Sequence, residues 1–359
     1  MKLIKKVKYH FENMIYKKRF GKKFYLDDYK IKGNNFSGRK LNIITLFHTI
    51  NTFAENNIIA PLKELGDVDI FELTPVAHSK EWYKYKSQKN RLMLNFVDNI
   101  TSKKKVDVIM IYITGHGTDM ETLKKLREYN IPIISECYDD ERKFRSRKGK
   151  DGIYRGMKDV CKYFDLSLTT SKSAIIKYLV EGGHPIYKDF AGNEKIYKNL
   201  YLEKEYDVGF VGASYGVRGE YINFLRQNGI SVYTKGNGWK EGFAEADEMI
   251  EIFNKSKIVL GFSTVGKNDD IYILKGRDFE VPFTGSFYIT GYHEELKEYF
   301  ELEKDIETYT SKEDLLKKVI YYLSHEQERE AIAQNGYQKC LQNYTAKKSY
   351  EKVFGYLDL

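Results

Sequence analysis

From residue 41 onward, short apolar runs alternate with segments of helical periodicity, and this alternation constrains the fold more than any other feature of the chain. In the first half, apolar runs typical of buried parallel strands occupy residues 41–47, 68–73, 106–114, 131–135 and 164–170. Segments with helical spacing lie between them, at residues 52–65, 80–102, 119–129 and 171–183. Strands that alternate with helices in this way predict a parallel sheet with helices on both of its faces.

A second series of the same kind begins near Tyr206. Its predicted strands, the first with the turn that follows it, lie within residues 206–214, 230–234, 257–263 and 286–290. A helix is expected over residues 219–227, and the tail is helical from Ser311, whose hydroxyl is a suitable N-cap. Two successive series of similar length predict an α/β chain with two Rossmann-like domains, divided within the polar segment 189–205. In such domains a ligand lies at the carboxyl ends of the strands.

The length and composition fit this prediction. A chain of 359 residues is long enough for two domains with separate cores. No apolar run approaches the roughly 18 residues that a membrane-spanning helix needs, and no signal-peptide core follows the basic N-terminus. Three widely spaced cysteines, Cys137, Cys161 and Cys340, form neither a metal-binding nor a redox motif. We therefore expect a cytoplasmic protein without a metal site.

The net charge of +8 is unevenly distributed, and the first thirty residues carry Lys and Arg in clusters among Tyr, Phe, Ile and Met. A basic amphipathic segment of this kind docks on anionic bilayers. The alternative is an extension that stays in solvent or packs on the domain. Basic and aromatic residues together also hold single-stranded nucleic acid, but no recognition motif accompanies them here. We expect residues 1–30 to meet an anionic membrane surface or the domain, and no nucleic acid.

A glycine turn follows the first strand of the second series. Gly212 lets a ligand approach the backbone, the next helix begins with N–H groups that favour an anion, and Arg218 adds a cation. The turn lacks the GxGxxG pattern of NAD- and FAD-binding proteins. After the next strand, glycines in the segment 235–242, Gly238 among them, suit a loop that lines a cleft. Trp239 in this loop either stacks on a base or packs on the domain, and packing is favoured.

The segment 275–290 predicts a short helix, a turn and an apolar strand. Lys275, Arg277 and Glu280 are expected on one helix, where residues three or four apart are neighbours. This combination suits a nucleoside diphosphate, with the carboxylate on the ribose hydroxyls and the cations on the phosphates. The alternative is an ordinary surface ion pair.

Four polar residues follow strands of the first series. His116 lies between two glycines after the third strand, where it is a candidate general base, and His48 after the first strand is a similar candidate. A turn histidine without a chemical role is the alternative. Asp139 and Asp140 are paired carboxylates that suit a base or a metal. The basic run that follows them, residues 142–150, is expected to be a solvated loop, although it also suits an anionic acceptor such as a lipid-linked pyrophosphate.

Residues 206–356 resemble a known family through an ordered series of motifs. YDVGFVGASYGVRGEYINFL, GNGW, KGRDFEVPFTGSFYIT and the helical tail resemble the CgeB-like glycosyltransferases (spore maturation protein B type), and SECYDD matches more loosely. The resemblance implies a GT-B fold, with the donor nucleotide on the C-terminal domain and the acceptor on the N-terminal one. It divides the chain into a basic extension (1–35), an N-terminal domain (36–195), a C-terminal domain (196–343) and a final helix that returns to the N-terminal domain (344–359).

The resemblance also implies roles for the predicted site. Arg277 would contact the phosphates, Glu280 the ribose hydroxyls, and Gly212 and Arg218 would form the phosphate-facing turn. The substrate would be a UDP-, GDP- or dTDP-linked sugar, with no cofactor and no bound metal, because cations and a helix N-terminus stabilise the leaving diphosphate. Tyr272 stands where retaining relatives often carry a second glutamate, so the stereochemical outcome stays open.

Three functions are compatible with these features. The leading one is a transferase that moves the sugar to a hydroxyl of a cell-surface glycan or its lipid-linked precursor. His116, or else Asp139 or Asp140, would take the acceptor proton if the enzyme inverts. The alternatives are a sugar-nucleotide epimerase of the same architecture and a non-catalytic relative that binds a nucleotide or glycan.

Overall fold

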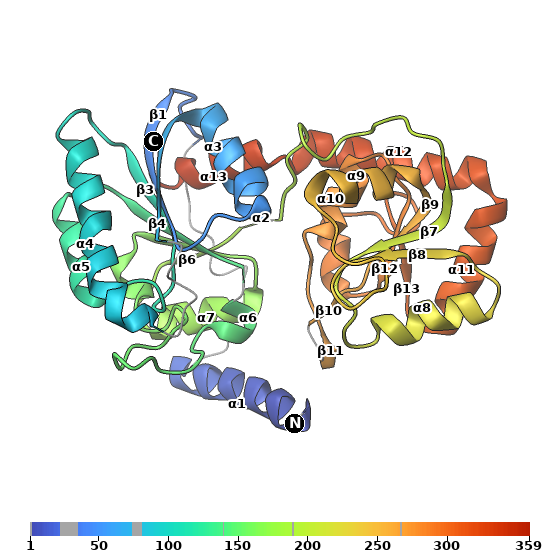
Figure 1. Cartoon of the computed structure of the whole chain (residues 1–359), viewed down its shortest axis with the longest axis horizontal. Helices are drawn as coiled ribbons and strands as arrows, with labels where there is room; N and C mark the ends of the chain where they lie inside the picture. Colours follow the sequence, from blue (N-terminus) through green and yellow to red (C-terminus); the bar gives the residue numbers. More distant parts are fainter. Residues whose placement is uncertain (1, 22–34, 74–80, 139, 189, 266–267) are drawn as a thin grey trace. The chain divides into compact units, whose positions relative to one another are not determined.

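The computed structural model describes residues 2–21, 35–73, 81–138, 140–188, 190–265 and 268–359, and it divides into two compact units. The first unit consists of residues 3–189 and 349–359, so the last residues return to the unit in which the chain begins. The second unit consists of residues 190–348. Each unit contains a parallel sheet with helices packed against it, as the alternating pattern predicts (Figure 1).

In the first unit, six of the described strands form one parallel sheet in the order β2-β1-β3-β4-β5-β6. The strands are β1 (Leu41–Phe47), β2 (Gly66–Glu72), β3 (Val108–Tyr112), β4 (Ile133–Cys137), β5 (Leu166–Thr169) and β6 (Pro185–Tyr187). The central strands are buried over nearly their whole length, because helices cover both faces. The register pairs Ile43 with Val68 on one side and with Val108 on the other, so the carboxyl ends of the strands meet at one edge.

Helices pack on both faces of this sheet. They are α2 (Thr52–Ala54), a π-helical turn (Glu55–Ile59), α3 (Ala60–Leu65), α4 (Trp82–Thr101), α5 (Met120–Glu128), α6 (Asp140–Lys143) and α7 (Lys172–Val180). α5 begins as predicted, because the Asp119 carboxylate accepts a hydrogen bond from the Thr122 N–H at 2.8 Å. α7 begins after Ser171, but the Ser171 hydroxyl donates to Glu141. Ser171 is therefore the N-cap of α7 by position, and its side chain caps no backbone N–H of that helix.

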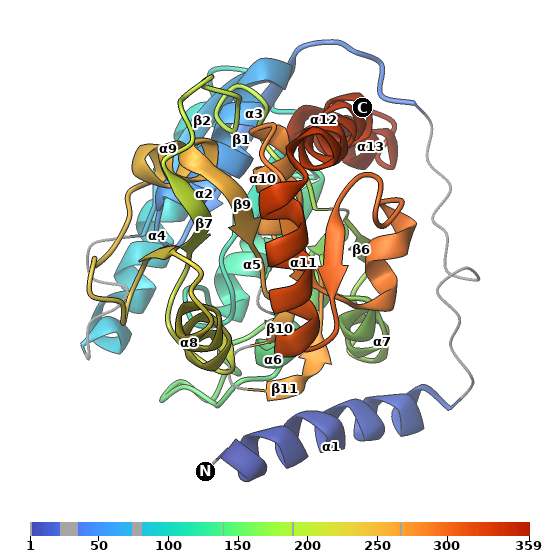
Figure 2. The ribbon, with the colours of Figure 1, turned by 90° about the vertical axis from the view of Figure 1, so that its right-hand side faces the viewer.

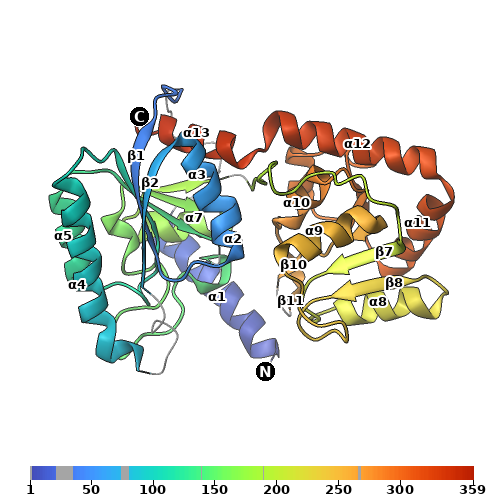
Figure 3. The ribbon, with the colours of Figure 1, turned by 45° about the horizontal axis from the view of Figure 1, so that its top comes forward.

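The last helix, α13 (Ala346–Gly355), belongs to the core of the first unit. Tyr350, Val353 and Phe354 are buried there with residues of β1 and α3, such as Leu41 and Leu62. Figure 3 shows α13 beside these two elements. This confirms that the final helix returns to the N-terminal domain.

The basic N-terminal segment forms a helix, α1 (Lys2–Phe20), that packs on the first unit near α6 and α7 (Figures 1 and 2). Tyr16 is buried, and the centre of its ring lies 5.8 Å from that of Phe144. The Tyr16 hydroxyl donates to Glu181 at 2.8 Å. Packing on the domain is therefore present, while the opposite side of α1 is exposed. No helix in the described part of the chain is long and apolar enough to cross a membrane.

The second unit contains five parallel strands within the described residues, in the order β13-β12-β9-β7-β8. They are β7 (Tyr206–Val211), β8 (Val232–Lys235), β9 (Ser256–Leu260), β12 (Tyr288–Gly291) and β13 (Glu307–Tyr309). A small antiparallel hairpin, β10 (Thr264–Val265) and β11 (Asn268–Tyr272), follows β9. The chain adds β8 on one side of β7 and β9 on the other, so the strand order reverses between β7 and β9. Open α/β sheets bind ligands in the crevice at such a reversal.

The helices of the second unit pack against its sheet (Figure 3). They are α8 (Arg218–Gln227), α9 (Ala246–Lys255), α10 (Arg277–Phe283), α11 (Lys312–Ser324) and α12 (Glu326–Asn343). Ser311 caps α11 as predicted, because its hydroxyl accepts a hydrogen bond from the Asp314 N–H at 3.1 Å. The predicted helical tail is not continuous: His325 and Tyr344 leave the helical conformation and separate α11, α12 and α13.

Candidate functional site

The carboxyl edge of the second sheet gathers most of the predicted donor-binding residues. Gly212 and Arg218 follow β7, Gly238 follows β8, and Arg277 and Glu280 belong to α10. A helix that precedes a parallel strand runs back from the carboxyl edge, so the N-termini of α8 and α10 both lie there. The reversal of strand order between β7 and β9 lies at the same edge.

The glycine turn after β7 is held by the loop after β8. The Gly212 N–H donates to the Lys235 carbonyl at 2.8 Å, and the Trp239 indole N–H donates to the Gly212 carbonyl at 2.7 Å. A Cβ atom on residue 212 would lie 3.0 Å from the Phe210 ring and 3.3 Å from the Arg218 guanidinium. Glycine here therefore leaves room for the Arg218 side chain. Trp239 packs against the core of the domain, as the sequence favoured.

Arg218 is the first residue of α8, and its guanidinium folds back over this turn. Its Nη1 donates to the Ala213 carbonyl at 3.0 Å, and its Cζ lies 4.1 Å from the centre of the Tyr215 ring. Burial lowers the pKa of Arg218 from its ordinary value. Its Nε is buried and has no hydrogen-bond partner in the described part of the chain. The protein thus holds this arginine in place and leaves one donor unused.

Gly238 shapes the neighbouring loop. Its φ of +90° lies in the left-handed region that favours glycine. A Cβ atom there would lie 3.1 Å from the Cβ of Ser214, whose N–H donates to the Asn237 carbonyl at 2.8 Å. Gly238 therefore lets the loop after β8 pack against the turn after β7.

Arg277 and Glu280 lie one turn apart on α10, as predicted, and form an ion pair. The Glu280 side chain is 4% exposed, whereas 33% of the Arg277 side chain is exposed. The Tyr197 hydroxyl also donates to Glu280, at 3.2 Å. The carboxylate is therefore fixed by two partners at the rim of the site.

Lys275 does not share this helix, contrary to the prediction. α10 begins at Arg277, and the Asp278 carboxylate accepts a hydrogen bond from the Lys275 backbone N–H at 2.7 Å. This bond leaves Lys275 ahead of the first turn. Asp278 also accepts from the Tyr288 hydroxyl at 2.8 Å, and burial raises the pKa of Asp278 to about 6. Asp278 was not predicted, although an Asp in the first turn of a helix often accepts a hydrogen bond from a backbone N–H just ahead of it.

Arg218 and Arg277 lie close enough for their charges to interact. Burial lowers the pKa of Arg277, and repulsion by Arg218 lowers it further. Like that of Arg218, the Nε of Arg277 is buried without a hydrogen-bond partner among the residues that the structure describes. Two like charges with unused donors at one sheet edge are stabilised by an anion that contacts both. This arrangement fits a diphosphate.

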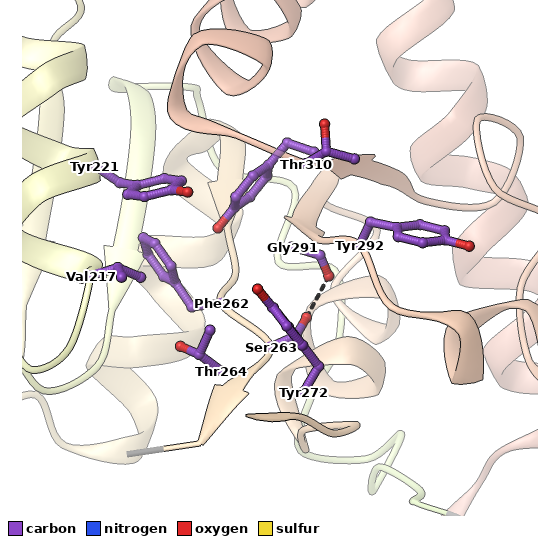
Figure 4. Close-up of a pocket in the computed structure, with 10 residues that line it drawn as sticks. Val217, Tyr221, Phe262, Ser263, Thr264, Tyr272, Gly291, Tyr292 and Thr310 are labelled. Carbon is purple, nitrogen blue, oxygen red and sulfur yellow. Dashed lines mark hydrogen bonds between the residues drawn. The ribbon is translucent and has the colours of Figure 1, made fainter. Parts of the chain in front are cut away.

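A pocket of about 380 Å³ opens at the same edge (Figure 4). Strand ends and the start of α8 supply its lining, which consists of Val217, Tyr221, Phe262, Ser263, Thr264, Tyr272, Gly291, Tyr292, Tyr309 and Thr310. The Arg218 Cζ lies 5.8 Å from the centre of the Phe262 ring, so Arg218 borders the pocket.

Aromatic rings and hydroxyl groups form the pocket wall, and none of these described lining residues is charged. The rings of Tyr221 and Phe262 meet edge to face at 5.9 Å, and the Ser263 hydroxyl donates to the Gly291 carbonyl at 2.5 Å (Figure 4). Such a wall suits a neutral ligand with many hydroxyl groups. Apart from Tyr272, the sequence analysis missed the lining, because strand ends that meet in space are far apart in the chain.

In the first unit, the structure brings His116 and His48 together. His48 follows β1, His116 follows β3, and their ring centres are 5.4 Å apart at the carboxyl edge of the first sheet. The Trp82 indole N–H fixes the loop by donating to the His116 carbonyl at 2.8 Å. Both histidines are half-buried. The two side chains therefore form one candidate base site.

Asp140 lies in a different environment. It is 1% exposed, it accepts a hydrogen bond from the Tyr178 hydroxyl at 2.9 Å, and burial raises its pKa to about 7. A carboxyl group buried to this extent favours a structural role over contact with an acceptor. Asp139 lies outside the described residues. Several cations of the run 142–150 are exposed, as predicted.

The described residues contain no cluster of three His, Cys, Asp or Glu side chains that would hold a metal ion. The cysteines are buried and free, and burial raises the pKa of Cys161 to about 12. A thiol with such a pKa stays protonated at neutral pH and is not a nucleophile.

Residues 218–355 match the sequence model of a glycosyl transferase-like family. No curated protein matches the chain. Among solved structures, sucrose-phosphate synthase from Thermosynechococcus elongatus is similar over 88% of this chain and 98% of its own, with a TM-score of 0.59 and 10% identity. The chain has the GT-B fold.

Two further solved structures are similar to this chain. Anabaena HepE, in complex with UDP and glucose, is similar over 88% of this chain and 99% of its own, with a TM-score of 0.57 and 10% identity. A putative UDP-N-acetylglucosamine 2-epimerase from Listeria monocytogenes is similar over 88% of this chain and 95% of its own, with a TM-score of 0.50 and 11% identity. At such identities the likeness shows the fold, so the activity has to be argued from the site.

Proposed function

We propose that this protein is a glycosyltransferase that moves a sugar from a nucleotide-sugar donor to a hydroxyl of a cell-surface glycan or its lipid-linked precursor. The observation that carries the proposal is the position of Arg218 and Arg277, at the starts of α8 and α10 on the carboxyl edge of the second sheet, with the Glu280 carboxylate paired to Arg277. The match to a glycosyl transferase-like family supports it, because residues 218–355 include both arginines and Glu280.

In the proposed complex each ligand group has its own contact. Arg218 and Arg277 contact the diphosphate through their guanidinium groups, Lys275 adds a cation ahead of α10, and Glu280 accepts from the ribose hydroxyls. The adjoining pocket takes the sugar, whose hydroxyls meet Ser263 and the other polar wall groups. UDP-, GDP- and dTDP-linked sugars fit this description equally. UDP-glucose is the first donor to try, because HepE was solved with UDP and glucose.

The transfer breaks the bond between the anomeric carbon and the diphosphate oxygen and forms a bond from that carbon to the acceptor oxygen. The diphosphate leaves with the electron pair, and Arg218 and Arg277 stabilise its charge, so we propose that neither a bound metal nor a cofactor is needed. In an inverting reaction, the acceptor proton passes to His116 or to its neighbour His48. Tyr272 in the pocket wall stands where a carboxylate would serve a retaining reaction.

An epimerase is the second candidate, because the Listeria structure has the same fold. An epimerase would change the donor sugar without any acceptor, so product analysis with donor alone separates the two activities. A non-catalytic relative, the third candidate, would bind the nucleotide and release no product.

The test is release of nucleoside diphosphate from UDP-, GDP- and dTDP-glucose, with and without a lipid-linked oligosaccharide acceptor. We expect acceptor-dependent release from one donor, with a loss of about a hundredfold in Glu280→Ala because the hydrogen bonds to ribose disappear. Asp207→Ala is the control, since Asp207 is an exposed carboxylate of the same unit, paired with Lys257 at 2.8 Å. Unchanged turnover in Glu280→Ala would contradict the proposed donor site.

We also propose a location. Nucleotide sugars are made in the cytoplasm, and a lipid-linked acceptor stays in a membrane. The two substrates meet at the inner face of the cytoplasmic membrane, where the protein would act as a peripheral protein.

A further inference from the structure

Two segments of the first unit account for the net positive charge of the chain. The helix α1 has seven Lys and Arg residues and one Glu, and the basic loop (residues 142–158, of which the first two end α6) has eight Lys and Arg residues and one Asp. Together these segments carry thirteen net positive charges, whereas the chain carries eight. The rest of the chain is therefore net negative, and the basic character belongs to one place on the molecule.

The inner side of α1 is occupied by the first unit. The Tyr9 hydroxyl donates to Glu141, the Tyr16 hydroxyl donates to Glu181, and Glu12 lies 3.7 Å from the Lys177 ammonium. These three residues of α1 are three or four positions apart, so they lie on one side of the helix. The contacts fix which side of α1 faces outward.

The outer side of α1 combines exposed apolar and basic residues. Phe11 is 55% exposed and Met14 is 57% exposed. Lys17 and Lys18 are exposed one turn further along the helix. Large apolar side chains that the fold leaves in water beside cations are typical of helices that lie in a membrane interface.

The basic loop lies next to the C-terminal half of α1. The ring of Phe144, in this loop, contacts the ring of Tyr16 at 5.8 Å. Three exposed cations, Arg142, Arg147 and Lys148, extend the positive surface from there. Figures 1 and 2 show α1 on the same side of the first unit as α6, from which the loop continues.

One end of this surface, near Tyr9, lies at the carboxyl edge of the first sheet. α6 follows β4 directly at that edge, and Tyr9 of α1 is bonded to Glu141 of α6. Rossmann-like units bind their ligands at this edge. A membrane bound here would bring lipid-linked molecules to the ligand-binding side of the unit.

We propose that the outer side of α1 and the loop 142–158 form one surface that binds the face of an anionic phospholipid bilayer. Phe11 and Met14 enter the interface, and the exposed cations of both segments contact the lipid phosphates. The inference deepens the proposed function, because it rests on a membrane-bound acceptor and names the surface that would reach it. Charge complementarity selects the partner, and the apolar pair distinguishes a bilayer from a soluble polyanion.

Vesicle flotation of the full chain, without donor or acceptor, tests this surface. We expect binding to phosphatidylcholine vesicles that contain phosphatidylglycerol and none to phosphatidylcholine alone. The triple variant Arg142→Gln, Arg147→Gln, Lys148→Gln should bind at least about tenfold more weakly, because each cation near an anionic surface contributes to binding. The matched control removes three exposed cations from α4 and α5, in Arg91→Gln, Lys124→Gln, Lys125→Gln, and should bind like the wild type.

A second variant tests the exposed apolar residues Phe11 and Met14. Phe11→Ser with Met14→Ser should lose most of the flotation at moderate salt, whereas Leu92→Ser with Ile320→Ser, which alters residues 45% and 52% exposed, should not. Equal loss in the test and control variants would overturn the proposal, and so would binding to single-stranded DNA without binding to anionic vesicles. Since flotation needs no turnover, a failed transferase assay and a failed membrane surface are distinguishable.

Discussion

The carboxyl edges of the two sheets differ in how fully their buried charged groups are hydrogen-bonded. At the first edge, Glu136 accepts hydrogen bonds from Lys188 at 2.5 Å and from the Tyr350 hydroxyl at 2.7 Å. At the second edge, Arg277 pairs with Glu280, but Arg218 and Arg277 each keep a buried Nε without a hydrogen-bond partner in the described residues. Buried polar groups that protein partners satisfy belong to the fold, whereas hydrogen-bond donors left unsatisfied beside an ion pair indicate a ligand site.

The largest effect on stability is expected at the hydrogen-bonded cluster of Glu136, Lys188 and Tyr350 in the first unit. The side chains of Glu136 and Lys188 are 3% and 5% exposed. Glu136→Ala leaves the Lys188 ammonium buried without its carboxylate, and we expect the free energy of unfolding of the first unit to fall by about 3–5 kcal/mol. Urea denaturation measures this change. Tyr350→Phe, which removes one hydrogen bond, is the graded control at about 1 kcal/mol. Similar values for both variants would mean that Glu136 is not the centre of the cluster.

Two arginines of α8 allow a matched test of the difference between a buried donor without a partner and a fully hydrogen-bonded one. Arg218 has a buried donor without a partner, whereas Arg226 donates to the Val232 carbonyl at 2.8 Å and to the Thr234 hydroxyl at 3.1 Å. Arg218→Gln should weaken nucleoside diphosphate binding by about 2 kcal/mol, roughly thirtyfold, with little change in stability. Arg226→Gln should lower the unfolding temperature and leave the affinity unchanged. Calorimetry and thermal denaturation separate the two outcomes, and the opposite pattern would reverse the assignment.

The buried carboxyl group of Asp140 predicts a pH dependence of stability. Burial raises its pKa in the folded protein to about 7, above the ordinary value of 3.8, so the folded state holds a proton that the unfolded state has lost. Stability should therefore fall as the pH rises from about 4 to 7, with a slope of at most about 1.4 kcal/mol per pH unit. Asp140→Asn should lose this slope and keep its transferase activity. Loss of activity with an unchanged slope would instead make Asp140 a catalytic group.

The smallest effect on nucleotide affinity is expected for the hydrogen bond that Tyr197 donates to Glu280. Tyr197→Phe removes one hydrogen bond at 3.2 Å and leaves the ion pair with Arg277. We expect nucleotide affinity to fall about two- to fivefold, since one neutral donor contributes about 0.5–1 kcal/mol. Tyr233→Phe, in which the altered ring stacks on Tyr206 at 4.2 Å, is the control. A loss as large as that of Arg218→Gln would mean that Tyr197 contacts the ligand itself.

The sequence predicted the buried strands because burial on both faces produces a continuous apolar run, as in β1 and β3. It missed β6 (Pro185–Tyr187) and β13 (Glu307–Tyr309), which lie at sheet edges and are too short for such a run. The ion pair of Arg277 with Glu280 followed from helical spacing alone. The prediction that Lys275 belongs to the same helix was wrong. The Asp278 carboxylate accepts a hydrogen bond from the Lys275 N–H, which leaves Lys275 ahead of the first turn of α10.

The rest of the site depends on contacts between distant segments. Tyr197 reaches Glu280 and His48 reaches His116 only once each unit has folded. The pocket wall likewise joins the ends of separate strands. Local periodicity carries no information about pairs of residues that are distant in the chain. The site residues were therefore predicted by type and position, and most of the residues that contact them were not.

Titration calorimetry with nucleoside diphosphates and the matching nucleosides tests the anion site most directly. UDP, GDP and dTDP are each compared with uridine, guanosine and thymidine on the wild-type protein. We predict that one diphosphate binds and that its nucleoside binds about a hundredfold more weakly, because only the diphosphate engages Arg218 and Arg277. Equal affinities for a diphosphate and its nucleoside, or no binding of any diphosphate, would contradict a diphosphate site at the carboxyl edge of the second sheet.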